Sequence, residues 1–142
     1  EFVYRSATRA EVPALIRCAH ASFGIFAGRL LAGHGCAPTK TGEVLACGLP
    51  FASSAVGDVD TQLRPSPAGV SVPEVTSDAL DRAARELAEK AAAPGVSAVA
   101  RELAERWFGL GAGVQAYDAI YRGMPRRHRG PSTLADGSWP PP

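Results

Sequence analysis

Residues 37–50 read Ala-Pro-Thr-Lys-Thr-Gly-Glu-Val-Leu-Ala-Cys-Gly-Leu-Pro, and the fold can be worked out from this stretch outward. Thr39 is a good N-cap, because its hydroxyl can accept hydrogen bonds from the free N–H groups of a following helix. The pattern predicts a helix over residues 40–47, and Gly48 stands where a left-handed residue ends such a helix. A strand is expected to begin within residues 49–52, since Pro50 is tolerated only near the start of a strand.

The first turn of this predicted helix is suited to binding an anion. Its free N–H groups and the positive end of its dipole attract negative charge, and Lys40 adds a mobile positive charge. Glu43 lies about one turn further along, where its carboxylate can reach the sugar hydroxyls of a ligand whose phosphates lie at the helix start. This arrangement suits a nucleoside diphosphate and its ribose. A capped surface helix that carries a Lys and a Glu is the alternative interpretation.

The same residues resemble a known family. The pattern Pro-Thr-Lys-x-Gly-Glu-x-Leu-Ala-Cys-Gly-Leu-Pro, with Val-Gly-Asp-Val-Asp at residues 56–60, is similar to the donor-binding segment of retaining GT-B-fold glycosyltransferases of the group 1, family 4 type. The resemblance extends in weaker form over residues 2–122. It implies that the chain binds a nucleoside diphosphate sugar for transfer to an acceptor. It also matches Glu43 to the Glu that holds the donor ribose, and it matches the phosphate loop to Ala37, Pro38, Thr39 and Lys40.

The resemblance has further implications for activity and partners. The family generally works without a bound metal, so neither a metal nor another cofactor is expected. An acceptor-binding domain and the first strands and helices of the donor domain are expected to lie outside residues 1–142. The isolated chain is therefore expected to transfer no sugar, and no catalytic residue is assigned.

The loop at residues 28–37 is expected to lie near the donor sugar. It contains three glycines and His34, and it follows a predicted parallel strand, where open α/β sheets bind ligands. His34 is otherwise a solvated loop histidine. The family has a sugar-contacting Glu at the position that is Gly35 here, so the way this chain would recognise the sugar stays open.

A second loop, residues 53–60, is expected at the same edge of the sheet. Gly57 indicates a tight turn there. Asp58 and Asp60 can meet ligand hydroxyls, a metal or water, and two carboxylates at this spacing do not make a metal site by themselves. Gly57 and Asp58 therefore join the candidate residues for the donor sugar.

Strand candidates alternate with helix candidates along the chain, which is typical of an α/β fold with a parallel sheet. Short segments rich in β-branched, aromatic or other apolar residues are expected as strands at residues 2–5, 22–27, 50–53 and 69–73. Helices are expected at residues 9–19, 40–47, 77–93, 97–108 and around 114–121. We predict a partial Rossmann-like parallel sheet of about four strands, flanked by helices and followed by C-terminal helices.

The C-terminal helices carry large apolar side chains at helical spacing. The helix at residues 97–108 is expected to bury Val99, Leu103 and Trp107. The last helix has one apolar face, formed by Val114, Tyr117, Ile120 and Tyr121. This end of the chain is similar to the end of the same glycosyltransferases, where the last helix often packs on the partner domain. Trp107, Tyr117 and Tyr121 are expected to be core or domain-interface residues rather than substrate platforms.

Residues 1–122 are thus expected to form a partial nucleotide-sugar-binding domain, and residues 123–142 a disordered Pro-rich tail. The net charge of +1 gives no electrostatic case for nucleic acid as a partner. A basic cluster at the tail is either solvated or bound to anionic lipid headgroups, and it comprises Arg122, Arg126, Arg127, His128 and Arg129. Cys18, Cys36 and Cys47 lack metal-type spacing. A cytoplasmic location, with contact at the inner membrane face left open, is expected.

Two other function classes stay open. The first is a non-catalytic nucleotide-binding remnant or accessory module. The second is an acyl-CoA-dependent N-acetyltransferase, because residues 5–12, Arg-Ser-Ala-Thr-Arg-Ala-Glu-Val, are similar to the first strand and helix of that family. Those enzymes need a later Gly-rich pyrophosphate loop after a strand, and this sequence has none, so this class ranks last.

Overall fold

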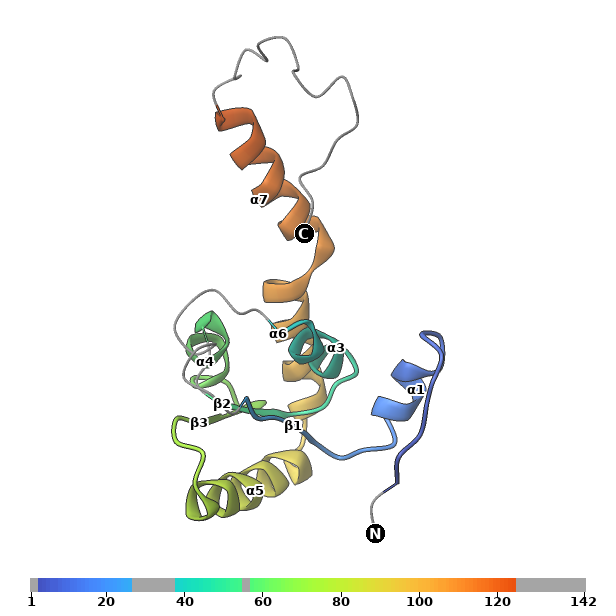
Figure 1. Ribbon diagram of the computed structural model, residues 1–142, viewed down its shortest axis with the longest axis vertical. Helices are drawn as coiled ribbons and strands as arrows, with labels where there is room; N and C mark the ends of the chain where they lie inside the picture. Colours follow the sequence, from blue (N-terminus) through green and yellow to red (C-terminus); the bar gives the residue numbers. More distant parts are fainter. Residues whose placement is uncertain (1–2, 27–37, 55–56, 125–142) are drawn as a thin grey trace, which may run out of the picture.

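A three-stranded parallel sheet lies at the centre of the molecule (Figure 1). The computed structural model describes residues 3–26, 38–54 and 57–124. The strands lie side by side in chain order, as β1 (Ser22–Gly24), β2 (Phe51–Ser54) and β3 (Gly69–Val72). Three strands are found in the described chain instead of about four, because residues 3–5 form no strand.

Helices cover both faces of this sheet, as expected for parallel strands. The helices of the described chain are α1 (Val12–Ile16), α3 (Thr39–Ala46), α4 (Gly57–Leu63), α5 (Ser77–Ala92), α6 (Val96–Phe108) and α7 (Leu110–Gly123). Of these, α3, α4 and α6 cover one face of the sheet and α5 covers the other. In Figure 1, α3 and α4 lie above the strands and α5 lies below them. The α/β class with a parallel sheet flanked by helices is therefore confirmed.

Alternation of side chains along β2 divides the apolar core into two parts. Phe51 points toward α3, α4 and α6, and it packs with Leu45, Leu63 and Ala100. The next residue, Ala52, points the other way and packs against α5 in a smaller cluster. That cluster also contains Val70, Val72, Ala83 and Leu87.

The helix predicted at residues 40–47 is confirmed as α3, with one correction at its start. The N-cap is Pro38 and Thr39 is already helical, so no side chain caps the helix. The C-terminal end is as expected, because Gly48 has a φ of 84°. Gly48 and Leu49 donate their N–H groups back to Leu45 and Val44, which closes the helix end in a Schellman motif.

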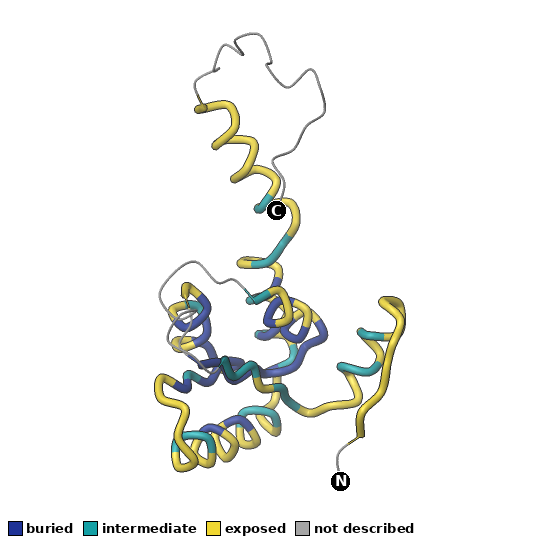
Figure 2. The backbone as a smooth tube through the Cα atoms, viewed as in Figure 1, coloured by how far each residue is buried: buried dark blue, intermediate teal, exposed yellow. Residues whose placement is uncertain are grey.

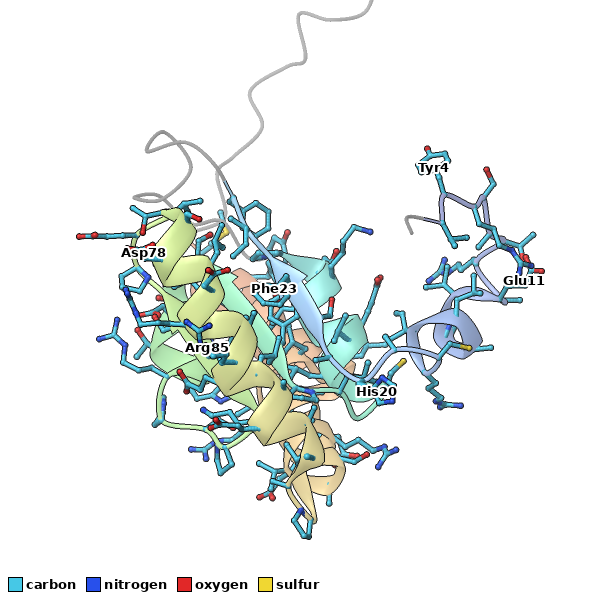
Figure 3. All side chains as sticks on the ribbon, turned by 90° about the horizontal axis from the view of Figure 1, so that it is seen from below. Tyr4, Glu11, His20, Phe23, Asp78 and Arg85 are labelled. Atoms are coloured by element: carbon cyan, nitrogen blue, oxygen red, sulfur yellow. The ribbon has the colours of Figure 1, made fainter. Side chains whose placement is uncertain are left out.

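The N-terminal segment is less regular than the sequence suggested. The helix expected at residues 9–19 is only α1, and the residues before it are exposed. A strand needs a neighbour for its backbone groups, and Tyr4 stands apart from the sheet in Figure 3. A local turn holds the segment instead, in which the Glu11 carboxylate accepts hydrogen bonds from the Thr8 N–H and hydroxyl at 2.8 Å each.

The buried face of α6 is rotated from the expected one. Val96, Ala100 and Ala104 are buried, whereas Trp107 is 48% exposed. The Arg106 guanidinium lies over the Trp107 ring, with its Cζ atom 5.3 Å from the ring centroid. Ala100 and Ala104 are small enough to let α6 approach α3 closely. The large residues Val99 and Leu103, expected to be buried, are only partly buried at the margin of the contact.

The last helix also differs from expectation. A single residue, Gly109, separates α6 from α7, and Gly123 is still helical. None of the α7 residues is buried, as the tube in Figure 2 shows. Tyr117 and Tyr121 are therefore not core residues of the described chain, and their role in a domain interface stays a prediction. Residues 125–142 lie outside the described residues.

Close contact between α3 and α6 is centred on Gly42. A Cβ atom added there would lie 2.8 Å from Cγ of Phe108 and 2.9 Å from its Cβ. These atoms are near the backbone of α6, so they cannot move aside without moving the helix. The position therefore requires glycine for packing, since the backbone of α3 has ordinary helical dihedrals there.

We expect Gly42→Ala to lower the free energy of unfolding by about 1–3 kcal/mol, the usual cost of overpacking. The matched control is Gly111→Ala in α7, where an added Cβ meets nothing within 4 Å. That control is expected to be neutral or to stabilise by up to about 1 kcal/mol through helix propensity. Urea unfolding followed by circular dichroism measures both, and equal effects would contradict the packing role of Gly42.

Candidate functional site

The carboxyl edge of the sheet is the place to look for a site in an open parallel fold. The chain leaves β2 toward α4 and β3 toward α5 at this edge. Ser54 extends the pairing of β1 with β2 there, because its hydroxyl accepts the Phe26 N–H at 3.0 Å. Three of the predicted site residues, His34, Gly35 and Ala37, lie outside the described residues.

The start of α3 keeps the features that favour an anion. Its N-cap is Pro38 and its first turn has no side-chain cap, which leaves backbone N–H groups without intrahelical partners. Thr39 and Lys40 are both exposed in this turn. Positive partial charge from the helix start and the full charge of Lys40 are thus available to a ligand from the solvent side.

An open groove runs between α3 and the end of α6. Its volume is about 410 Å³, and its lining residues are Thr39, Gly42, Glu43, Ala46, Ala104, Glu105, Phe108 and Gly109. The structure thus brings Thr39 and Glu43, two of the predicted site residues, together in one groove. The side chain of Glu43 is exposed, so its carboxylate is free to meet a ligand.

The opposite wall of this groove was missed by the sequence analysis. Glu105 and Phe108 are about 60 residues from Glu43 in sequence, and only the packing of α6 on α3 brings them near. Gly42 was the available signal, because a glycine inside a helix often marks a close approach of another element. The signal gives the position of the contact but does not identify the residue that makes it.

The second predicted loop, residues 53–60, contains the start of a helix instead. Gly57 has a positive φ of 54°, consistent with the tight turn expected there, and α4 begins at this residue. Asp60 is buried, and its carboxylate accepts hydrogen bonds from the Ser71 hydroxyl and the Arg64 guanidinium. Asp58 is exposed. Neither Gly57 nor Asp58 lines the groove that contains Glu43.

Thr41, in the first turn of α3, carries a buried hydroxyl group. Its side chain is fully buried, and its hydroxyl oxygen has no hydrogen-bond partner among the residues that the structure describes. A buried hydroxyl left unpaired costs about 1–3 kcal/mol. This destabilising hydroxyl lies in the first turn of α3, which is the turn that was predicted to bind phosphate.

Other chemical groups of the described chain give no competing site. The pKa of Glu11 is lowered, first by the Thr8 backbone N–H and then by the Thr8 hydroxyl, both of which favour the ionised carboxylate. Figure 3 shows Glu11 well away from the sheet. Within residues 3–26, 38–54 and 57–124, no cluster of three His, Cys, Asp or Glu side chains could hold a metal. No helix of this part of the chain is long and apolar enough to cross a membrane.

Comparison with known proteins assigns no family to this chain. The chain matches no protein-family model, and searches of the curated proteins and of the solved structures give no match either. The groove beside α3 is therefore judged by its own residues and geometry.

The buried carboxylate of Asp60 is expected to hold α4 against β3. Asp60→Ala leaves the Ser71 hydroxyl and the Arg64 guanidinium without their acceptor, so we expect a loss of about 1–3 kcal/mol in the free energy of unfolding. Asp58→Ala, two residues away and exposed, is the matched control and is expected to change it by less than about 0.5 kcal/mol. Urea denaturation measures both, and a neutral Asp60→Ala would show that this network does not stabilise the fold.

The unpaired hydroxyl of Thr41 allows a test in the opposite direction. Thr41→Val keeps the shape and removes the hydroxyl, so we expect the free energy of unfolding to rise by about 1 kcal/mol. Thr41→Ser keeps the hydroxyl and removes a buried methyl, and it is expected to destabilise the chain by about 1 kcal/mol. Thermal and urea unfolding measure the two variants, and a destabilising Thr41→Val would mean that the hydroxyl does have a partner in solution.

Proposed function

We propose that the chain is the donor-binding part of a nucleotide-sugar glycosyltransferase of the GT-B type. One observation carries the proposal: Glu43 and the start of α3, marked by Thr39, open onto the same groove. The sequence pattern at residues 38–50 resembles the donor-binding segment of that family. The arrangement provides an anion site and a free carboxylate on one helix, which is the pair of groups that a nucleoside diphosphate needs.

Ligand chemistry follows from the spacing along α3. The diphosphate would accept hydrogen bonds from the N–H groups of the first turn and pair with Lys40. Glu43 lies four residues after Thr39, about 6 Å further along the helix axis, and its carboxylate would accept hydrogen bonds from the ribose hydroxyls. Phe108 offers an apolar wall to the same ligand.

The charge that develops during sugar transfer also suits this position. Departure of the nucleoside diphosphate from the sugar increases the negative charge on its phosphate oxygens. The positive end of α3 and the ammonium group of Lys40 would stabilise that charge as it forms. Lys40 and the start of α3 would thus bind the leaving group beside the groove that Glu43 lines, and the acceptor would be held by a separate domain.

The sheet, in this proposal, is part of a Rossmann-like domain that continues beside β1. Phe23 on β1 is 44% exposed and faces a shallow apolar groove against α5, lined by small residues that include Ala84, Ala88 and Ala91. Further parallel strands and a covering helix would bury these side chains. Such an extension agrees with the expectation that the sheet has more strands than the described residues form.

Calorimetric titration of the purified chain with UDP, GDP and ADP tests the proposal. We expect one of the three to bind, with inorganic diphosphate as a weaker competitor. Glu43→Ala is expected to weaken binding about tenfold or more, because a hydrogen bond to a charged group contributes roughly 1.5–3 kcal/mol. Lys40→Ala is expected to weaken binding of both the nucleotide and inorganic diphosphate.

The control variant is Glu89→Ala, which removes an exposed carboxylate from α5 on the other face of the sheet. It is expected to leave nucleotide binding unchanged. Nucleotide binding that is equal in the parent chain and in Glu43→Ala would place the ligand elsewhere and overturn the assignment of this groove.

A further inference from the structure

The helix α7 is attached to the rest of the molecule through α6 and projects away from the sheet (Figure 1). Large apolar side chains remain on its surface, each with more than half of its area exposed. They are Leu110, Val114, Tyr117, Ile120, Tyr121 and Met124. Single exposed apolar residues are common on proteins, but a continuous apolar face of this length is typical of an interaction surface.

The spacing of these residues indicates a helix as the partner. Leu110, Val114, Tyr117, Tyr121 and Met124 follow one another at steps of four, three, four and three residues. This is the heptad pattern by which two helices pack side by side. Opposite the stripe, α7 carries small side chains, Ala112, Ala116 and Ala119, together with Gln115. We call these five residues together with Ile120 the α7 stripe.

The size of the stripe matches that of a specific interface. A standard protein–protein interface buries roughly 800 Å² on each partner. Six side chains of this size, each more than half exposed, present on the order of 800 Å² together. The α7 stripe alone therefore has about the area that one partner contributes to a standard interface.

We propose that the α7 stripe is a self-association surface, on which a second copy of this chain packs its own α7 in the antiparallel direction. The charges of α7 permit this pairing. Asp118 and Arg122 form an ion pair with each other at 2.9 Å, so the helix carries no net charge that would repel a copy of itself. The argument for this pairing does not rest on the proposed nucleotide site.

The flanks of the stripe favour the antiparallel direction. One flank has Gly113 and Ile120, and the other has Gly111 and Asp118. Antiparallel pairing brings each flank against the same flank of the other copy. Ile120 of one copy then fills the space above Gly113 of the other, where an added Cβ would meet nothing within 4 Å. Parallel pairing would instead bring the apolar flank against the charged one.

Charge complementarity supports the same arrangement. Asp118 of one copy lies opposite Gly111 of the other, in the first turn of α7. The N–H groups of that turn have no side-chain cap, because the N-cap residue is Gly109. A carboxylate near the positive end of a helix dipole is favourable, and the two-fold symmetry of the pair provides this contact twice.

Analytical ultracentrifugation of the full chain tests the proposal. The buffer contains a reductant, because Cys18 is exposed and could cross-link copies. We expect a monomer–dimer equilibrium with a dissociation constant of about 1–100 µM, typical of an interface of this size without large hot spots. Tyr117→Glu is expected to raise the dissociation constant at least tenfold, and Gln115→Glu, on the opposite face of α7, is the matched control.

Gly113→Leu separates the proposed packing from non-specific apolar association. The new side chain meets open space in the monomer, so the fold is expected to be unchanged by circular dichroism. It adds apolar surface, which would strengthen non-specific association, but it blocks the close approach of Ile120 from the second copy. We expect the dissociation constant to rise at least tenfold.

Two results would overturn the proposal. The first is a chain that stays monomeric up to about 1 mM, tenfold above the weakest expected dissociation constant, which would assign the stripe to a different protein. The second is a dimer that Gly113→Leu strengthens or that Tyr117→Glu leaves unchanged.

Discussion

The contact between α3 and α6 is the constraint on which the rest of the structure depends. Gly42 lets the ring of Phe108 lie directly against the backbone of α3. The alanines of α6, Ala100 and Ala104, keep the two helices close along the remaining contact. This contact covers one face of the sheet with a helix from the far end of the chain, and it also forms both walls of the groove that contains Glu43. Stability of the fold and shape of the candidate site thus have a common origin.

Local signals in the sequence were enough to predict elements whose ends are determined by backbone chemistry. Gly48 ends α3 as expected, and the helices expected at residues 77–93 and 97–108 appear as α5 (Ser77–Ala92) and α6 (Val96–Phe108). The prediction was weaker where distant residues decide the outcome. The N-cap of α3 is Pro38 and not Thr39. The buried face of α6 contains its alanines and not its largest side chains, because close approach of two helices stabilises their packing as much as large side chains do. In the candidate site, Thr39 and Glu43 could be predicted from one helix, whereas Phe108 could not.

The two edge strands of the sheet, β1 and β3, differ in what covers them. Just before β3, the Ala68 carbonyl accepts a hydrogen bond from the Phe51 N–H. The next carbonyl, that of Gly69, therefore points to the outer edge, where it accepts a hydrogen bond from the Lys90 ammonium group of α5. A lysine over an edge strand discourages pairing with another strand, and Pro73 ends β3 soon afterwards. On the β1 side, Phe23 remains partly exposed beside an apolar groove. A lysine thus covers the β3 edge, whereas the β1 edge keeps partly exposed apolar surface.

Gly109 has a consequence that reaches beyond its role as a break between helices. It lines the groove beside α3, and it is also the single residue through which α6 passes into α7. With no buried residue of its own, α7 takes the direction that the backbone of Gly109 gives it. A ligand that binds the groove more tightly at one setting of this backbone will therefore shift the direction of α7. By reciprocity, whatever fixes α7 will change the affinity of the groove by the same factor.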